Sequence, residues 1–333
     1  MEPLLSVRGL RTSFFLKDRE LRAVDGLSYD LHRGQTTAVV GESGSGKSVH
    51  ALSILGLLPQ PPARIVGGDI LFQGRSLPGL SKRELRALRG NRIAMIFQEP
   101  MTSLNPVLTV GEQIAEGMAV HEGYSRRKAM ARALRLLDLV GIPDARRRLR
   151  AYPHEFSGGM RQRVMIAIAL SCDPDLLIAD EPTTALDVTI QAQILDLLRE
   201  VQQRFQMGVL LITHNWAVVA EMAEDVIVMY SGRQMEGGTC AKIFRTPKHP
   251  YTKALLGSLP SLTSRKERLA AIPGLPPDPR QPVRGCPFAP RCPEVFDRCR
   301  QEDPPLFVLP GARVSACWKS QPEAQASSHR YDA

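Results

Sequence analysis

The sequence lacks any apolar run long enough to cross a membrane. No stretch of its 333 residues approaches the roughly 18 consecutive apolar residues that a spanning helix needs. Its start, MEPLLSVRGL, is strand-like and lacks the charged and apolar segments of a secretory signal peptide. We therefore expect the chain to stay in the cytoplasm, where any role at a membrane is peripheral and depends on a partner that spans it.

Aromatic residues are scarce as well, at 5% against 43% for all hydrophobic residues, which predicts an aliphatic core in a globular protein. The formal net charge is +9, and basic residues are densest at Arg126–Lys128 and Arg146–Arg150. Basic clusters can bind nucleic acid or anionic lipid. Because no aromatic residues alternate with these arginines as stacking platforms for bases, we interpret them as solvated faces and expect no nucleic-acid partner.

The chain contains no CxxC pair, the spacing that is typical of zinc ribbons. Of its six cysteines, four crowd near the end and are separated by five, six and seventeen residues: Cys286, Cys292, Cys299 and Cys317. In a reducing cytoplasm, clustered cysteines bind metal more often than they form disulfides. Four thiolates suit tetrahedral zinc or an iron–sulfur cluster, and packing without a ligand stays open as the alternative.

The order of periodic segments predicts an α/β protein. Apolar runs that are typical of buried parallel strands occur at 37–40, 176–179, 209–212 and 226–229. Helical patterns occur at 48–58, 110–172 and 190–205, and the last fits a right-handed crossover between parallel strands. After Tyr251 the periodicity fades and prolines become dense, which predicts a linker, a small second module and, from about Ser320, a disordered polar tail.

A glycine-rich segment between the first of these buried strands and the helix after it matches the phosphate-binding pattern GxxxxGK[ST] in full. Its residues are Gly41, Glu42, Ser43, Gly44, Ser45, Gly46, Lys47 and Ser48. Glycines allow backbone N–H groups to point at a phosphate, and the helix N-terminus adds a positive dipole. We expect Lys47 to reach the β- and γ-phosphates of a nucleotide, and the Ser48 hydroxyl to bind Mg²⁺.

Two carboxylates follow the apolar run at 176–179. A buried strand of this kind delivers Asp180 to the magnesium ion, and Glu181 can act as the general base on the attacking water. Alone, an apolar run before Asp-Glu is a weak signal. Together with the phosphate-binding loop it predicts a nucleotide-hydrolysing protein.

The segment Phe156–Arg163, FSGGMRQR, stands just before a helical pattern and ahead of the paired carboxylates. With it the chain resembles the ABC ATPase family over about residues 4–250, because the signature of that family reads LSGGQ at this place. The resemblance implies that two such domains pair head to tail, so that Ser157, Gly158 and Gly159 of one subunit close over ATP held by the other. Met160 and the residue before Ser157 depart from the signature, at positions that need not contact phosphate through their side chains.

Four further positions take their expected roles only from this resemblance. Gln98 corresponds to the glutamine that senses magnesium beside ATP, and His214 to the switch histidine that contacts the γ-phosphate. Asp187 lies in the segment that communicates across the dimer. Phe14 corresponds to the aromatic residue that stacks on adenine, with the next residue as a close rival. After the histidine the family normally has Asp, where this chain has Asn215.

Four longer motifs narrow the resemblance to the dipeptide, oligopeptide and nickel importer branch. They are QEPMTSLNP at 98–106, DEPTTALDVT at 180–189, HPYT at 249–252 and GCPFAPRCP at 285–293. The implied fold is a P-loop NTPase of the ABC type over 1–255, with a RecA-like core, an antiparallel β subdomain and a helical subdomain at about 99–172. A cysteine module at 256–319 and the tail at 320–333 follow, and for the cysteines the branch implies a [4Fe-4S] cluster, with zinc as the alternative.

The resemblance implies an ATPase that uses ATP and Mg²⁺ to power import of dipeptides or oligopeptides, at the cytoplasmic side of the inner membrane. Its implied partners are a second ATPase subunit, related or identical, two transmembrane permeases and, indirectly, a periplasmic or extracellular substrate-binding protein. Nickel or glutathione-like cargo stays open, because selectivity lies in those other subunits. Two other classes also stay open: a soluble ABC ATPase that acts on nucleic acid, and a metal-sensing cysteine module with the ATPase as its regulator.

Overall fold

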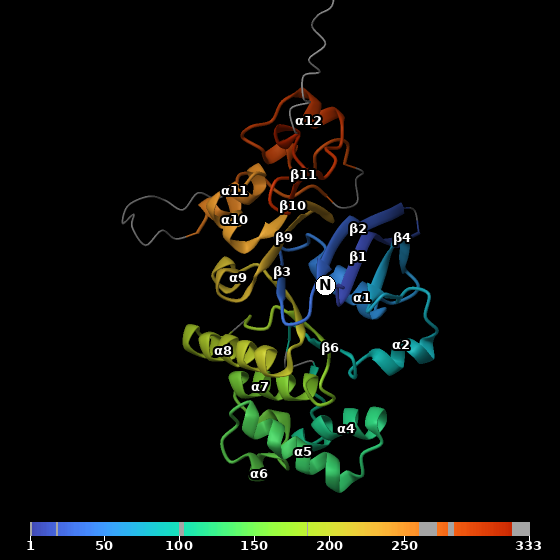
Figure 1. Cartoon of the computed structure of the whole chain (residues 1–333), viewed down its shortest axis with the longest axis vertical. Coiled ribbons are helices and arrows are strands. Elements are labelled where there is room, and N and C mark those ends of the chain that lie inside the picture. Colours follow the sequence, from blue (N-terminus) through green and yellow to red (C-terminus); the bar gives the residue numbers. More distant parts are fainter. Residues whose placement is uncertain are drawn as a thin grey trace, which may run out of the picture.

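The computed structural model describes residues 2–17, 19–99, 103–184, 186–259, 272–278 and 283–321. These residues form a large mixed sheet, a smaller antiparallel sheet beside it, a group of helices at one end and a cysteine-containing region at the opposite end (Figure 1). Within the described ranges, none of the helices combines the length and the apolar composition that crossing a bilayer would require.

The large sheet has eight strands in the order β11-β12-β10-β9-β3-β8-β7-β6. Its five strands from β9 to β6 are parallel, and the three at the other end are antiparallel. Their bounds are β3 Thr36–Val40, β6 Ile93–Ile96, β7 Leu176–Asp180, β8 Gly208–Thr213, β9 Asp225–Tyr230, β10 Arg233–Thr239, β11 Phe307–Leu309 and β12 Arg313–Ser315. Every residue of β3, β7 and β8 is buried, as expected for apolar strands that are covered on both faces.

Helices join the parallel strands. The chain runs from β7 through α8 (Val188–Phe205) to β8, and then through α9 (Trp216–Met222) to β9. The sequence-based prediction of parallel strands with intervening helices is thus confirmed, because the buried runs and the three-to-four spacing of apolar residues in α8 both persist in the fold.

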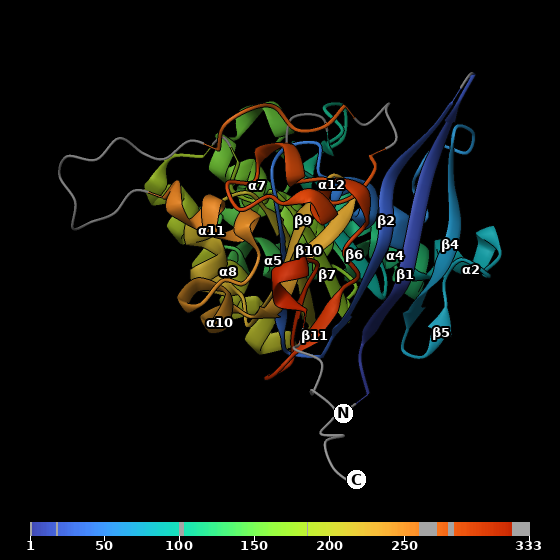
Figure 2. The same ribbon diagram turned by 90° about the horizontal axis from the view of Figure 1, so that it is seen from above.

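The smaller sheet is antiparallel, with the order β2-β1-β4-β5, and forms a separate layer in Figure 2. Its strands are β1 Leu5–Leu16, β2 Arg19–Leu31, β4 Ala63–Phe72 and β5 Arg75–Ser76, and α2 (Lys82–Leu88) follows it. Helix α1 (Lys47–Leu55) packs between the two sheets, because Ile54 shares one apolar cluster with Leu5 of β1 and Ile178 of β7. This placement brings the antiparallel layer next to the phosphate-binding loop.

A helical group inserted between β6 and β7 has its own apolar core. Its members are α4 Val110–Glu122, α5 Arg126–Leu139, α6 Ala145–Arg148 and α7 Gly158–Ala169. Thr109 and Glu112 form a capping box at the start of α4, which satisfies two otherwise unpaired N–H groups. Ile114, Leu137 and Val164 are buried together in the group, and the predicted helical insert is confirmed.

The C-terminal region extends the large sheet. Strand β12 pairs with β10 through Glu236 and Ser315, and Arg313 of β12 donates to the fully buried carboxylate of Glu236 at 2.8 Å. Its helices are α10 Cys240–Arg245, α11 Pro250–Gly257 and α12 Asp297–Gln301. The sequence did not predict these strands. Residues 260–271 of the linker and 322–333 of the tail lie outside the described residues, so the expected disorder of the tail stays a prediction.

Candidate active site

The phosphate-binding loop connects the end of β3 to α1, as the motif requires. Two of its glycines have no room for a side chain: a Cβ at Gly41 would lie 2.1 Å from the carbonyl oxygen of Met229, and one at Gly46 would lie 2.2 Å from that of Ala23. Gly46 also has a φ of 98°, in the left-handed region that favours glycine. The loop therefore folds tightly against β9 and β2. Two of its N–H groups have protein acceptors, since that of Glu42 donates to the Tyr251 hydroxyl and that of Ser45 to the carbonyl oxygen of Glu42.

Lys47 lies buried at the mouth of this loop. Its ammonium donates to the carbonyl oxygens of Gly41 at 2.8 Å and Glu42 at 3.0 Å. Burial lowers the pKa of Lys47, and the nearby carboxylates, Glu181 foremost, oppose that shift. The charged ammonium is thus held by the loop backbone, within reach of the space where phosphates would bind.

Asp180 ends β7 beside Ser48 and fits a magnesium ion. Its side chain is buried, and burial raises the pKa of Asp180, against the opposing effect of a hydrogen bond from Ser48. Its Oδ1 atom has no hydrogen-bond partner among the described residues, although an unpartnered buried carboxylate oxygen is costly. Carboxylate and hydroxyl oxygens suit Mg²⁺, so Asp180 and Ser48 are the residues that would hold it. When bound, the ion supplies positive charge against the phosphate oxygens.

Glu181 follows Asp180 and is oriented by two neighbours. One carboxylate oxygen lies 2.7 Å from Nδ1 of His214, and the other accepts a hydrogen bond from the Thr184 hydroxyl at 2.8 Å. The backbone of Glu181 has a φ of 51°, which is unusual for a residue with a side chain, and its N–H donates to Ile212 of β8. The left-handed turn aims the carboxylate at the cleft that the phosphate-binding loop lines.

That cleft has a volume of about 900 Å³ and brings together most of the residues predicted from the sequence. Around it lie the loop from Gly41 to Ser48, Glu181, His214, Gln98 and Phe14. Phe14 lies on β1, where its ring is half-buried, whereas Phe15 is 48% exposed and does not line the cleft. The geometry favours Phe14 over Phe15 for contact with a base.

The signature turn is not at the cleft of its own chain. Ser157 caps α7, where its hydroxyl accepts from the N–H of Met160 at 3.4 Å, and both Ser157 and Gly158 are exposed. Gly159 packs so closely on α8 that a Cβ there would lie 2.7 Å from Ile190. The exposed residue Asp187 caps α8 next to it. The four residues expected to act on a partner's nucleotide, Ser157, Gly158, Gly159 and Asp187, therefore gather on a surface of their own.

Comparisons with known proteins identify the family. A model for ABC transporters matches residues 24–184, and a model for the oligopeptide/dipeptide transporter C-terminal region matches residues 235–299. The chain is 53% identical to a probable peptide ABC transporter ATP-binding protein of Sinorhizobium fredii, over 95% of each chain. It is 51% identical to the dipeptide transport ATP-binding protein DppD of Bacillus subtilis, over 98% of this chain and 97% of that protein.

The chain belongs to the ABC transporter family. Its structure also resembles the dimeric structure of MJ0796, a bacterial ABC transporter cassette, with a TM-score of 0.64 and 25% identity over 71% of this chain and 98% of that chain. A second solved relative, cbiO1 of Clostridium perfringens, has a TM-score of 0.63 and 27% identity over 74% of this chain and 92% of that chain. The predicted ABC-type nucleotide-binding fold is confirmed.

Three departures from the ABC sequence pattern have structural explanations. Phe156, in place of Leu, is buried in the helical core under the guanidinium of Arg148, 5.3 Å from the ring centre. Met160, in place of Gln, packs against the same core. Asn215, in place of Asp, still caps α9, because its side-chain oxygen accepts from the N–H of Ala217 at 3.0 Å.

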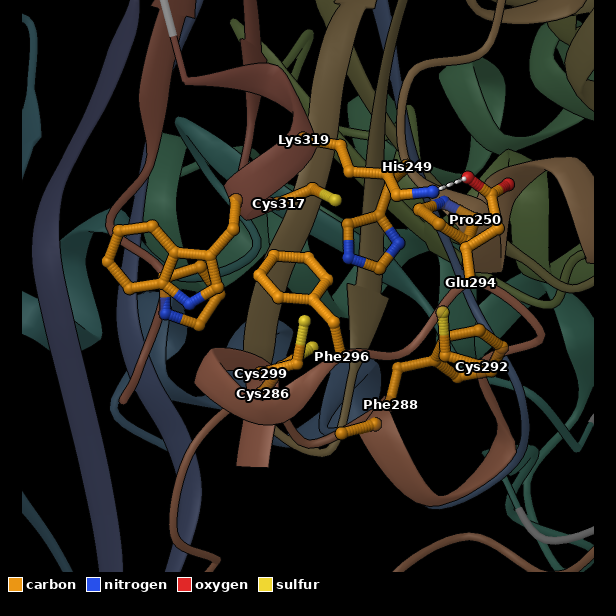
Figure 3. Close-up of a pocket in the computed structure, with 13 residues that line it drawn as sticks. His249, Pro250, Cys286, Phe288, Cys292, Glu294, Phe296, Cys299, Cys317 and Lys319 are labelled. Carbon is orange, nitrogen blue, oxygen red and sulfur yellow. Dashed lines mark hydrogen bonds and ion pairs between the residues drawn. The ribbon is translucent and has the colours of Figure 1, made fainter. Parts of the chain in front are cut away.

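The four C-terminal cysteines line one small pocket, which Figure 3 shows together with His249, Phe288 and Phe296. Cys286 and Cys299 lie next to each other, since the N–H of Cys286 donates to the carbonyl oxygen of Cys299 at 2.8 Å. Burial raises the pKa of Cys286 to about 12, and it also raises the pKa of Cys292 and Cys317. Burial therefore disfavours the thiolate form of these three cysteines.

The expected metal centre at these cysteines is not supported. Four sulfur donors suit iron or zinc, but among the residues that the structure describes no group of three or more His, Cys, Asp or Glu is arranged to hold an ion. The pocket has a volume of about 20 Å³, which is room for about one water molecule. Cys286, Cys299 and Cys317 are buried and Cys292 is half-buried around this small space.

Sequence reasoning assigned no role to several residues that shape the nucleotide cleft. Thr184 orients Glu181, while Tyr230, Tyr251 and Arg291 surround the side of the loop that carries Glu42. Thr184 and Arg291 both fall inside motifs that are visible in the sequence. Membership of these motifs could have pointed to a role for both residues. The contacts that they make could not be predicted, because the partners of Arg291 lie in segments that are distant along the chain.

Proposed function

We propose that this chain is the ATP-hydrolysing subunit of a peptide importer, and that it binds ATP between its own phosphate-binding loop and the Ser157–Gly159 turn of a second ATPase subunit. The observation that carries this proposal is the exposure of that turn at the N-terminus of α7, away from its own cleft. N–H groups at a helix N-terminus can donate to the γ-phosphate of a neighbour's nucleotide. A dimeric ABC transporter cassette among the similar solved structures supports the pairing.

In this dimer, each chain's own residues divide the chemistry. The N–H groups of the loop and the ammonium of Lys47 bind the phosphates, and Asp180 with Ser48 would hold the magnesium ion. Glu181, oriented by Thr184 and His214, accepts a proton from the water that attacks the γ-phosphate. The P–O bond to the β-phosphate breaks, and ADP and phosphate leave. Binding favours the closed dimer, which is how ATP can drive a change of conformation in attached subunits.

Peptide cargo is supported by the relatives. Those named above are a probable peptide transporter protein and a dipeptide transport protein, and the C-terminal match is to the oligopeptide/dipeptide transporter region. We infer two permeases as membrane partners, an external substrate-binding protein as an indirect partner, and a peripheral position at the cytoplasmic face of the membrane. For the cysteines, the donor chemistry alone supports an iron–sulfur cluster, which would require the pocket to open.

Reconstitution tests this function. The chain would be combined in proteoliposomes with permeases of a peptide importer, and uptake of a labelled dipeptide would be measured with ATP inside and outside. We expect uptake that depends on ATP and is lost in a complex carrying Glu181→Gln. Uptake of a nickel chelate or of glutathione in place of the peptide would redirect the cargo assignment, and nuclease-sensitive sedimentation of the chain without membranes would contradict import.

A further inference from the structure

A side chain of the C-terminal region reaches into the phosphate-binding loop. Arg291, on the short turn Ala289–Arg291, donates to both carboxylate oxygens of Glu42, with Nη1–Oε2 at 2.7 Å and Nη2–Oε1 at 3.1 Å. The two residues are 249 positions apart in the sequence. The Arg291 side chain is 5% exposed and that of Glu42 is 23% exposed, so this is a largely buried, two-pronged ion pair.

The guanidinium is itself held in place. It donates to the Tyr230 hydroxyl at 3.1 Å and to the carbonyl oxygen of Pro273 at 3.0 Å. The backbone N–H of Glu42 donates to the Tyr251 hydroxyl at 3.0 Å, and the rings of Tyr230 and Tyr251 pack at 4.6 Å between centres. The second residue of the phosphate-binding loop is therefore fixed at both its backbone and its side chain by residues that follow the parallel strands.

The charge of Glu42 makes this contact relevant to ATP. Glu42 lines the same cleft as Lys47 and Ser48, where a triphosphate carries several negative charges. An unpaired carboxylate there would repel the phosphates, and in a partly buried site the repulsion is less screened than at the surface. The two hydrogen bonds from Arg291 hold the Glu42 carboxylate and place a positive charge beside it, which offsets such a repulsion.

We infer that Arg291 is a positioning residue of the ATP site, which acts through Glu42 and makes ATP affinity depend on how the C-terminal region is docked. The inference rests on the ATP site of the proposed function but not on the cargo. As a consequence, a substitution confined to the cysteine-containing region alters the affinity for nucleotide, although no residue that contacts nucleotide is substituted.

The chain offers a matched pair for comparison. Arg313 and Glu236 form a second buried ion pair in the same region, with side chains 5% and 0% exposed, but neither lines the nucleotide cleft. Arg298 of α12 and Glu302, the residue just after this helix, form an exposed pair. Arg313→Ala therefore reports what loss of a buried pair does to folding. Arg298→Ala reports what loss of an exposed pair does, together with loss of the contact between Arg298 and the Trp318 ring.

The test is binding of MgATP to the purified full chain, measured by calorimetry, together with thermal unfolding of each variant. Arg291→Ala should weaken ATP binding about tenfold, equivalent to one decade in Kd, because it exposes the phosphates to the Glu42 carboxylate. Adding Glu42→Gln to Arg291→Ala removes that carboxylate, so the double variant should return to within about twofold of wild type, as expected for two residues that act as one unit. Arg298→Ala should bind ATP as wild type does.

Two results would overturn the inference. The first is an ATP affinity of Arg291→Ala equal to that of wild type. The second is a weakened affinity that Glu42→Gln does not restore, together with a fall in melting temperature equal to that of Arg313→Ala, because the Arg291–Glu42 pair would then be purely structural. Wild-type chain that binds ATP no better than Lys47→Ala would instead contradict the ATP site itself, whereas failure of peptide uptake would leave this inference standing.

Discussion

The nucleotide cleft and the cysteine pocket differ in what surrounds their reactive groups. The cleft is open, at about 900 Å³, and its polar groups are arranged before any ligand arrives: Lys47 is held by loop carbonyls and Glu181 by two side chains. The pocket holds about 20 Å³ beside aromatic rings, and burial raises the pKa of Cys286, Cys292 and Cys317. The arrangement of polar groups around an open cleft indicates which ligand it binds. Donor residues that pack against one another around a small space give no such indication.

The largest effect should come from the cleft at Glu181. Glu181→Gln keeps the size of the side chain but removes the carboxylate that we propose as the base, so ATP hydrolysis should fall about 1000-fold while ATP binding persists. Phosphate release and equilibrium binding measure the two separately. Glu200→Gln, on the exposed face of α8, is the control and should hydrolyse normally. Undiminished turnover in Glu181→Gln would show that the orientation of this carboxylate has no catalytic purpose.

Lys47→Ala should weaken ATP binding about 100-fold, since a charged hydrogen bond to phosphate in a partly buried site contributes up to about 3 kcal/mol. Binding of a fluorescent ATP analogue measures the loss. Lys82→Ala, at the exposed start of α2, provides a variant with the same change of charge and no contact with the cleft. Equal ATP affinity of the two variants would show that Lys47 contributes no more to ATP binding than an exposed surface lysine does.

The cysteine pocket should show the chemistry of buried neutral thiols. At pH 8, alkylation of Cys286 by iodoacetamide should be at least about 30-fold slower than in the unfolded chain, because a higher pKa leaves less thiolate to react. The pKa of Cys286 is raised to about 12 in the folded state, so the neutral thiol stabilises the folded state and its ionisation at alkaline pH favours unfolding. That contribution is complete below the unfolded pKa of about 9, and it is lost as pH rises towards 12.

Mass spectrometry of labelled peptides measures the alkylation, and iron analysis of anaerobically purified chain accompanies it. Protein that contains iron and resists labelling at every pH would contradict the description of the pocket as closed and would support an iron–sulfur cluster. Iron-free protein whose labelling rate rises with pH would confirm that the two regions differ as described.

Phe14→Ala should have the smallest effect, about a fivefold loss of ATP affinity, from the lower range of stacking between a base and an aromatic ring. Phe15→Ala is its natural control, because the two residues are adjacent on β1 but only Phe14 lines the cleft. Comparison of ATP with a triphosphate that lacks a base measures the contribution of stacking. A larger loss in Phe15→Ala would reverse the assignment.

Much of the site could be predicted because its parts are short and continuous. The loop from Gly41 to Ser48 and the carboxylates at the end of β7 each combine a local conformation with its chemistry, and parallel strands then bring their ends to one edge of the sheet. The cysteines mislead for the opposite reason. Their number and proximity indicate a ligand, but the size of the space between them follows from how Phe288 and His249 pack around it.

The sequence by itself determined the ABC fold, the phosphate-binding loop, the paired carboxylates and the signature turn, since each depends on residues within a few positions of one another. Only the tertiary structure decided that β12 extends the main sheet beside β10 and that Arg291 and Tyr251 hold Glu42. These contacts join segments more than 70 residues apart, as the separations of 77, 209 and 249 positions show. A contact of that kind arises from the packing of whole elements, and no local pattern encodes it.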